Sequence, residues 1–266
     1  MKIASVARSS NPDPAQTGGV LGVIPARIGS SRLPRKPLLD IAGRPLIEWV
    51  WRRAETLEVL DDLVVAADAP EVVEVVEGFG GRAVLTRGEH PSGTDRVAEV
   101  AEDAEFVGCH WIVNLQGDEP FLPHGAARAV VEQLRSGWDV GTAATPIYST
   151  VEWEDPSAVK VIRDDRGGAL YFSRAPIPYD GTGKAGEQLL MLRHVGIYAF
   201  TRAALRQATS LPKHPLEERE GLEQLRWLAA GLRIGVAVVE GGGPGIDTEE
   251  DLVRAEQILG GREDSA

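Results

Sequence analysis

The stretch Val20–Pro37, VLGVIPARIGSSRLPRKP, joins a short apolar run to a basic loop. The run from Val20 to Ile24 has the length of a buried strand, and Pro25 is expected to end it. The loop after it contains small and basic residues, and no acidic residue occurs before Asp40. In such loops backbone N–H groups point at anionic oxygens, and Arg and Lys side chains neutralise their charge. The stretch therefore indicates a polyphosphate-binding loop, with an ordinary solvated basic loop after a first strand as the alternative.

The loop is neither of the two common nucleotide-binding loops, because it lacks the spacings G-x-x-x-x-G-K-[ST] and G-x-G-x-x-G. Its charge contrasts with the rest of the chain, which has 266 residues, is 43% hydrophobic and carries a formal net charge of −12. This acidic balance argues against nucleic acid and anionic membrane surfaces as partners, so the local positive charge is expected to serve an anionic ligand. The length suits one large α/β domain, or one domain with an excursion, and it supports a sizeable core.

The two polar ends of the chain are expected to be disordered, and the single cysteine fits a cytoplasmic protein. Residues 1–18 are polar and lack the apolar segment of a signal peptide, so we expect a disordered extension there, like the tail at residues 260–266. The folded domain is expected to span residues 19–259, and no run of about 18 apolar residues occurs that would cross a membrane. Cys109 is the only cysteine, which excludes an internal disulfide and fits a reducing compartment.

The N-terminal half alternates apolar runs of strand length with helical patterns. Strands are expected at 20–24, 63–67, 82–86 and 111–115, and helices from Arg44 and at 71–79, 94–102 and 123–135. Pro45 is expected in the first turn of the first helix, where its missing N–H costs nothing. This alternation predicts βαβ units and a doubly wound α/β fold, with a mostly parallel sheet and helices on both faces.

Polar loops follow three of these strands, after Ile24, Thr86 and Leu115. In doubly wound sheets, ligands bind outside the carboxyl ends of the strands. We therefore expect residues 27–36, residues 87–96 and Asp118 to lie along one rim of the sheet and to form a single site.

Beyond Asp139 the pattern changes. Strands are expected at 141–147, 159–163, 169–172 and 195–200 with little helix between them, which suggests a smaller antiparallel part at about residues 139–215. A helix at 216–230 and a last strand at 233–239 follow. Thr248 and Asp251 have the spacing of a capping box at the start of the final helix.

Eight blocks of the chain, in this order, resemble the 3-deoxy-manno-octulosonate (Kdo) cytidylyltransferases, which make CMP-Kdo from CTP and Kdo. They are IPARIGSSRLPRKPL, TRGEHPSGTDR, VNLQGDEP, VKVIRD, ALYFSRAPIP, LRHVGIYAF, PLEEREGLEQLR and GIDTEEDL, and the resemblance covers about residues 20–259. Many sugar nucleotidyltransferases share the first block in a looser form, whereas the ordered set is far more specific. The resemblance implies a sheet of the nucleotide-diphospho-sugar transferase type, with a smaller antiparallel part that binds the sugar acid and mediates a homodimer.

The reaction implied by the resemblance is nucleotidyl transfer for lipopolysaccharide or capsule synthesis. The anomeric hydroxyl of Kdo attacks the α-phosphorus of CTP, and pyrophosphate leaves in line. Mg²⁺ suits this chemistry, and the resemblance assigns the ion to Asp118 and Asp247. The alternatives are a turn residue in Gly-Asp-Glu-Pro for Asp118 and a helix cap for Asp247, although Thr248 can already supply the capping oxygen.

The resemblance assigns the triphosphate of CTP to the first loop. The implied catalytic residues are Arg27, Arg32, Lys36 and Asp118, and the further CTP contacts include Ala26 and Arg87. Many relatives have Gly in L-P-G-K-P where this chain has Arg35. Arginine disfavours a positive φ there, so we expect it either to reduce the adaptability of the loop or to add a phosphate contact, without removing activity.

Ser92, Gly93 and Thr94 resemble the cytosine-reading segment of the family. Two hydroxyls and a close approach of the backbone suit the O2, N3 and amino edge of cytosine. The alternative is an ordinary loop in which Thr94 caps the next helix. His90 has no second histidine at metal-ligand spacing and is expected to be a polar loop residue.

The residues that match family positions around the sugar acid are Gln116, Arg174, His194, Tyr198, Glu223 and Gln224. The fork of an arginine pairs both oxygens of a carboxylate, which suits Arg174. Tyr198 in the core and Glu223 on a solvated helix face are the alternatives for these two residues.

Two other functions stay open at this point. One is the same chemistry on another 2-keto-3-deoxy sugar acid, such as the 8-amino analogue of Kdo or a sialic-type acid, because one pocket residue can invert such a preference. The other is a catalytically silent nucleotide-binding scaffold. The intact charges of Arg27, Lys36, Asp118 and Asp247 argue against the scaffold, since clustered charges are costly unless they are used.

Overall fold

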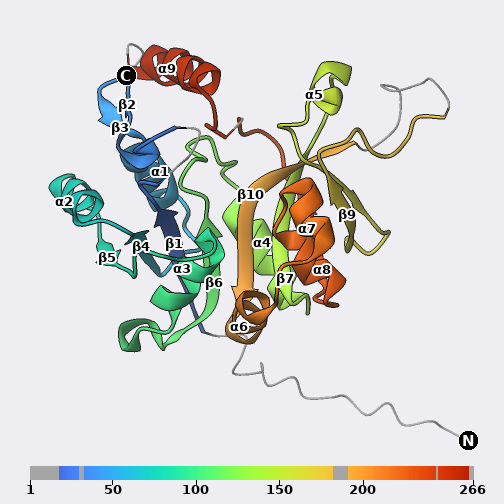
Figure 1. Cartoon of the computed structure of the whole chain (residues 1–266), viewed down its shortest axis with the longest axis horizontal. Helices are drawn as coiled ribbons and strands as arrows, with labels where there is room; N and C mark the ends of the chain where they lie inside the picture. The colour runs from blue at the N-terminus through green and yellow to red at the C-terminus, as the bar shows by residue number, and fades with distance from the viewer. Residues whose placement is uncertain (1–17, 30–32, 182–190, 244, 264–266) are drawn as a thin grey trace, which may run out of the picture.

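The structure, a computed structural model, describes residues 18–29, 33–181, 191–243 and 245–263. Its centre is a nine-stranded sheet with the order β11-β7-β10-β6-β1-β4-β5, in which β8 also pairs with β10, and β9 with β8 (Figure 1). The strands are β1 (Gly19–Ala26), β4 (Asp62–Ala67), β5 (Ala83–Leu85), β6 (Cys109–Leu115), β7 (Val140–Pro146), β8 (Lys160–Arg163), β9 (Ala169–Ser173), β10 (Leu192–Thr201) and β11 (Ile234–Val238), beside a small hairpin of β2 (Asp40–Ile41) and β3 (Arg44–Pro45).

The described helices comprise short 3-10 turns and longer α-helices. The 3-10 turns are at Lys36–Leu38 and Ala104–Phe106, and the α-helices are α1 (Leu46–Glu55), α2 (Pro70–Gly78), α3 (Gly93–Ala101), α4 (Ala126–Arg135), α5 (Thr150–Glu154), α6 (Arg202–Ser210), α7 (Pro215–Glu220), α8 (Gln224–Ala229) and α9 (Glu249–Glu263). In the part of the chain that the structure describes, no helix has the length and apolar character needed to cross a membrane.

The sheet is mostly parallel, as the alternating pattern predicts. β1 pairs in parallel with β4 and β6, β4 with β5, and β7 with β11, whereas β10 runs antiparallel to β6 and β7. The antiparallel part expected at about residues 139–215 is joined to this sheet, because β7 and β10 are members of it. β10 is long enough to pair with β6 and β7 and, near Leu192 and Arg193, with β8 as well. Of the described strands, β8 and β9 branch away from the main sheet.

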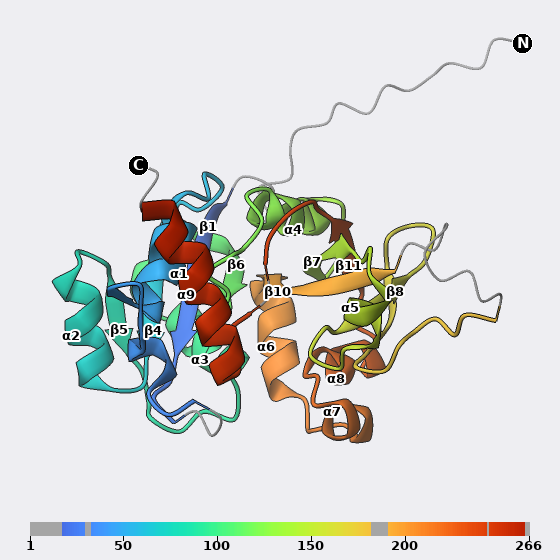
Figure 2. The same ribbon diagram turned by 90° about the horizontal axis from the view of Figure 1, so that it is seen from above.

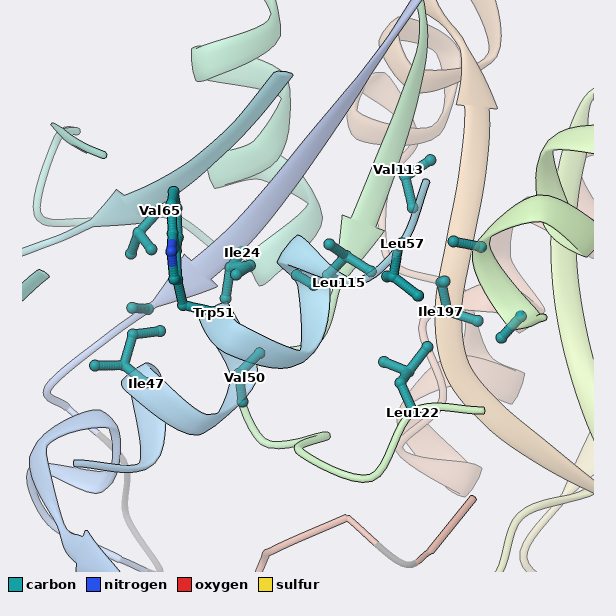
Figure 3. Close-up of a cluster of buried hydrophobic side chains, with 14 of the residues drawn as sticks. Ile24, Ile47, Val50, Trp51, Leu57, Val65, Val113, Leu115, Leu122 and Ile197 are labelled. Carbon is teal, nitrogen blue, oxygen red and sulfur yellow. The ribbon is translucent and has the colours of Figure 1, made fainter. Parts of the chain in front are cut away.

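Helices cover both faces of the sheet, and each face has its own apolar core. Helices α1, α2, α4 and α9 pack on one face, and α3, α6 and α8 pack on the other. Side chains of β1 alternate between the two cores: Ile24 joins the first and Val23 the second, both fully buried. Figure 3 shows the first core, in which Trp51 of α1 lies among side chains from several strands. A strand that is buried on both faces reads as a continuous apolar run, which is why β1 is visible in the sequence.

Several element boundaries differ from the expectations. β1 continues through Pro25 to Ala26, and Pro45 precedes α1 as its N-cap instead of lying in its first turn. The helix expected at 216–230 is two helices, α7 and α8, because Gly221 adopts a left-handed conformation with φ of 66° that ends α7. α7 and α8 lie side by side in both views (Figures 1 and 2).

The ends of the domain also differ from the expected ranges. α9 extends to Glu263, so a disordered tail from residue 260 is wrong for residues 260–263. Of the N-terminal extension expected at residues 1–18, residues 1–17 lie outside the described residues.

Candidate active site

The main cavity opens at the carboxyl ends of the parallel strands. Its volume is about 1060 Å³, and its lining combines the loop after β6, the loop after β11, the start of β10 and α8. Of the residues predicted for the site, it is lined by Gln116, Asp118, Arg174, His194, Tyr198, Glu223, Gln224 and Asp247. The structure thus gathers on one rim side chains that come from opposite ends of the sequence, as expected for a sheet of this type.

Lys36 joins the two aspartates predicted for a metal ion. Its Nζ donates to Asp118 Oδ2 at 2.6 Å and to Asp247 Oδ1 at 2.9 Å. The Lys36 side chain is only 12% exposed, whereas the side chains of Asp118 and Asp247 are 32% and 44% exposed. The two carboxylates therefore face the opening, with a positive charge held between them.

The backbone brings these charges together through close packing at the end of β6. A side chain at Gly117 would place its Cβ 2.7 Å from the carbonyl oxygen of Pro25, so glycine is needed where β6 passes the end of β1. The carbonyl of Asp118 accepts from the backbone N–H of Ile246 at 2.9 Å, which fixes the segment before Asp247 beside the loop after β6.

The described set of acidic, histidine and cysteine side chains does not include a group of three that could hold a metal ion. A divalent cation at this rim would therefore take Asp118 and Asp247 and complete its shell with ligand oxygens and water. Mg²⁺ favours this arrangement, since it takes one or two carboxylates together with substrate phosphates and keeps several waters. The donor set fits that ion.

The basic loop after β1 is closed by backbone contacts. Asp68 accepts from the N–H of Ile28, and the N–H of Arg35 donates to the carbonyl of Ile28 at 3.1 Å. Ala26 is buried at the end of β1 and Arg27 is exposed beside it, while Arg32 lies outside the described residues.

Arg35 stands where many relatives have glycine, and it adopts a left-handed conformation with φ of 57°. Arginine disfavours this conformation but does adopt it here. Its guanidinium forms a two-pronged ion pair with Glu71 of α2. This pairing directs the Arg35 side chain toward α2.

Glu119, which sequence reasoning missed, lies next to Asp118 in the cavity wall. Burial and the neighbouring charge of Asp118 raise the pKa of Glu119 to about 7. Its Oε1 accepts from the N–H of Gly196 at 3.3 Å, which ties the loop after β6 to β10. Its position directly after the Gly-Asp pair is the sequence signal that could have identified it.

Ser92 and Thr94 both contact Glu223 of the segment between α7 and α8. Ser92 Oγ lies 2.9 Å from Glu223 Oε1, and Thr94 Oγ1 donates to Glu223 Oε2 at 2.7 Å. Ser92, and not Thr94, caps α3, because its Oγ accepts from the N–H of Asp95. Burial raises the pKa of Glu223, while the Thr94 and Ser92 hydroxyls and the Arg226 guanidinium oppose that rise. Glu223 is therefore no solvated helix-face residue.

Gly93 lies against the end of β1, where its added Cβ would be 3.4 Å from Pro25 Cγ. The segment 92–94 and the basic loop are thus neighbours on the rim. The Arg87 side chain is 79% exposed and lies against α3, where its Nε donates to Glu99 at 2.9 Å. His90 also contacts Glu99, at 2.6 Å, and is a partnered loop residue as expected.

An aromatic wall forms the far side of the main cavity. His194 contacts Phe172 edge-on and Tyr198 at 5.2 Å between ring centres, and Tyr198 contacts Trp227 edge-on. Burial lowers the pKa of His194 to about 3 and raises the pKa of Tyr198 well above its ordinary value, so both rings are neutral.

The tautomer of His194 follows from its contact with Thr142. The single hydroxyl hydrogen of Thr142 is donated to the carbonyl of Ile197 at 2.8 Å, so Nε2 of His194, 2.8 Å from the same hydroxyl oxygen, must donate. Nδ1 then carries the lone pair and is available as an acceptor.

Arg174 and Arg193 supply positive charge to this half of the cavity. Arg174 donates to the carbonyls of Glu220 and Pro156, which holds its guanidinium at the cavity wall. Arg193, missed from the sequence, pairs with Glu152 of α5 and donates to the carbonyl of Gly243. Its place directly before His194 was the available signal.

Comparisons with known proteins agree with this geometry. The profile of a family described as cytidylyltransferase matches residues 21–234. Curated 3-deoxy-manno-octulosonate cytidylyltransferases from Gemmatimonas aurantiaca and Methylococcus capsulatus are 51% and 47% identical, over 89% and 90% of this chain and 92% and 96% of their own lengths.

A solved structure of CMP:2-keto-3-deoxy-manno-octonic acid synthetase complexed with CTP superposes with a TM-score of 0.84 at 41% identity. The match covers 92% of this chain and 99% of the solved one. The chain belongs to the 3-deoxy-manno-octulosonate cytidylyltransferase family, as the ordered sequence blocks predicted.

Proposed function

We propose that this chain transfers CMP from CTP to the anomeric hydroxyl of 3-deoxy-D-manno-octulosonate and releases pyrophosphate. The observation that carries the proposal is the meeting of Lys36, Asp118 and Asp247 at one edge of a cavity whose far wall presents Arg174 and His194. The names of the relatives and the CTP complex of the solved neighbour support the same activity.

The residues of the chain have to align CTP with the sugar acid and neutralise the charge of the phosphates. Little covalent catalysis is needed, because phosphoryl transfer depends mainly on positioning and electrostatic stabilisation. Lys36 places a fixed positive charge where the phosphates of CTP meet the rim, and Arg27 adds a second cation at the start of the loop. The fork of Arg174 holds the carboxylate of the sugar acid. Nδ1 of His194 accepts a sugar hydroxyl, and the sugar is held with its anomeric oxygen toward the α-phosphorus.

We propose Mg²⁺ as the cofactor, with Asp118 and Asp247 as its protein ligands. When bound, the ion supplies Lewis-acid neutralisation of the phosphate oxygens. The two carboxylates support this assignment because they are partly exposed and directed toward the cavity opening.

The proposal extends to the setting of the enzyme: a homodimer in the cytoplasm that feeds lipopolysaccharide or capsule synthesis. Exposed apolar side chains beside the cavity support association, since Tyr148 and Val151 are 82% and 78% exposed. Light scattering coupled to size-exclusion chromatography measures the oligomeric state directly.

Pyrophosphate release tests the activity. The protein is incubated with CTP and Mg²⁺ and, in parallel, with Kdo, its 8-amino analogue, N-acetylneuraminate or no sugar. We expect release with Kdo, none without sugar, and none after chelation of the metal. Release with another acid alone would keep the chemistry and replace the substrate. A protein that binds CTP but releases no pyrophosphate with any acid would contradict the proposal and support the scaffold.

A further inference from the structure

Arg174 lines the main cavity, and the backbone around it engages only part of its guanidinium. Its Nε donates to the carbonyl of Glu220 at 2.9 Å, and its Nη1 donates to the carbonyl of Pro156 at 3.0 Å. A guanidinium has five N–H donors, and those on Nη2 of Arg174 have no partner among the described residues. The anchored side chain therefore keeps donors for an anionic group in the cavity.

The carboxylate of Glu220, the last residue of α7, holds the backbone that carries Arg174. Its Oε2 accepts from the N–H of Arg174 at 2.9 Å, and its Oε1 accepts from the Ser173 hydroxyl at 2.7 Å. Ser173 is 2% exposed, and its Oγ in turn accepts from the N–H of Ala175 at 3.0 Å. One carboxylate thus fixes the end of β9 and the two residues that follow it.

The end of α7 explains why the carbonyl of Glu220 is available to Arg174. The last carbonyls of a helix have no partner within the helix and carry partial negative charge, which attracts a cation. Gly221 ends α7 in a left-handed conformation, and its N–H donates back to the carbonyl of Glu217 at 2.7 Å. The Glu220 carbonyl lies outside that closing bond and accepts from Arg174 instead. Both the side chain and the backbone of Glu220 therefore contact the same arginine.

We propose that Glu220 is a positioning residue for recognition of the sugar acid: its carboxylate and its carbonyl hold Arg174 in the cavity wall, with the Nη2 donors available to the substrate carboxylate. Glu220 itself is not one of the residues that line the main cavity, so it acts through Arg174. The inference rests on the proposed function in taking a sugar acid as the occupant of this part of the cavity.

Equilibrium binding and turnover test the inference together. Kdo binding is measured by calorimetry with CTP and a metal chelator present, and KM values for Kdo and CTP are measured with Mg²⁺. Both are determined for the wild type, Glu220→Ala and Glu220→Gln. Glu218→Ala is the matched control, because Glu218 is an exposed residue of the same helix.

Glu220→Ala should weaken Kdo binding and raise KM for Kdo by about tenfold, because the arginine fork is no longer held at the cavity. KM for CTP should stay within about twofold of the wild-type value, and Glu218→Ala should change neither KM. Equal rises of both KM values in Glu220→Ala would show a general structural role and overturn the inference.

Glu220→Gln separates the hydrogen bonds of Glu220 from its charge. Gln keeps an acceptor for the N–H of Arg174 and a polar group for Ser173, but it removes a negative charge that acts on the buried Lys160. Kdo binding should stay within about threefold of the wild type. A loss as large as that of Glu220→Ala would mean that the charge near Lys160 is what matters, and the inference would fail.

A double-mutant cycle with Arg174→Ala asks whether Glu220 acts through the arginine. Arg174→Ala should weaken Kdo binding, and adding Glu220→Ala should weaken it by no more than about twofold further. Additive losses would overturn the inference. Should Glu220→Ala not fold, Ser173→Ala removes one partner of the carboxylate and should raise KM for Kdo by about threefold; an unchanged KM would then overturn the inference.

Binding and turnover also separate this inference from the proposed reaction. A wild type that binds Kdo but releases no pyrophosphate would contradict the reaction, and the affinities of the variants would still decide the role of Glu220. A wild type that binds no Kdo would overturn the inference, because Arg174 would then hold no sugar acid.

Discussion

The part of the site proposed for the nucleotide, called the nucleotide half below, and the part proposed for the sugar acid, called the sugar half, are built in opposite ways. The nucleotide half consists of loops that follow parallel strands, and its aspartates are partly exposed around Lys36. The sugar half consists of buried side chains on β10 and α8, with His194, Tyr198 and Trp227 in ring contact. The comparison teaches that an exposed charged cluster organises the first half, whereas packed rings beside Arg174 and Arg193 organise the second. Changes in the first half should therefore affect turnover, and changes in the second should affect sugar affinity and stability.

The largest effect is expected at Asp247, which belongs to the nucleotide half. Asp247→Asn should lower kcat by about a hundredfold to a thousandfold, because a charged group that organises the phosphates is lost. The melting temperature should change little, since the start of α9 is held independently by the reciprocal bonds of Thr248 and Asp251. Turnover and thermal melting are measured beside Glu249→Gln, an exposed control in the same turn. Near-wild-type turnover would contradict the proposal that Asp247 is a metal ligand.

The second effect lies in the sugar half, at Arg174. Arg174→Lys should raise KM for the sugar acid by about tenfold, because an ammonium cannot make the two-pronged contact with a carboxylate. KM for CTP should stay the same. Arg166→Lys, in an exposed turn, is the matched control. A rise confined to KM for CTP would contradict the division of the cavity into two halves.

A third, smaller effect is the pH dependence of stability, which is expected to differ between Glu119 and His194. The pKa of Glu119 is raised from 4.5 to about 7, so its contribution to stability is complete below pH 4.5 and is lost as the pH rises through 7. The pKa of His194 is lowered from 6.5 to about 3, so its contribution is complete above pH 6.5 and is lost as the pH falls toward 3. The stability contributions of Glu119 and His194 therefore change with pH in opposite directions.

Melting temperatures of Glu119→Gln and His194→Gln measure these two slopes. The melting temperature of Glu119→Gln relative to that of the wild type should be higher near pH 8 than near pH 5. The melting temperature of His194→Gln relative to that of the wild type should be higher near pH 4 than near pH 8. Parallel pH profiles for both variants and the wild type would show that neither group titrates in this way.

The smallest effect is expected at Arg35, outside both halves of the cavity. Glycine there removes a left-handed strain of about 1–2 kcal/mol, but it adds unfolded-state entropy of about 0.5–1 kcal/mol and loses an exposed ion pair worth up to about 1 kcal/mol. Arg35→Gly should therefore shift the melting temperature by no more than about 3 °C and keep turnover. Glu71→Gln isolates the contribution of the ion pair. A tenfold loss of turnover in Arg35→Gly would mean that Arg35 acts on the triphosphate.

The parallel half of the fold and the nucleotide rim were predictable from sequence. Strands buried on both faces appear as apolar runs, and the rule that ligands bind at their carboxyl ends placed Lys36 and Asp118 on one rim. The break between α7 and α8 was not predicted, because the apolar positions continue across Gly221 and only its positive φ ends the first helix. α6, which begins after the N-cap residue Thr201, was not predicted.

What the sequence by itself determined was the fold class, the order of most elements and the family, since periodicity and ordered motifs are local properties of the chain. Only the tertiary structure decided which side chains meet. Lys36 between Asp118 and Asp247, and Glu223 against Ser92 and Thr94, join positions that are far apart along the chain. Such contacts depend on sheet order and register, in which β1 lies beside β6 and β10 lies antiparallel between β6 and β7.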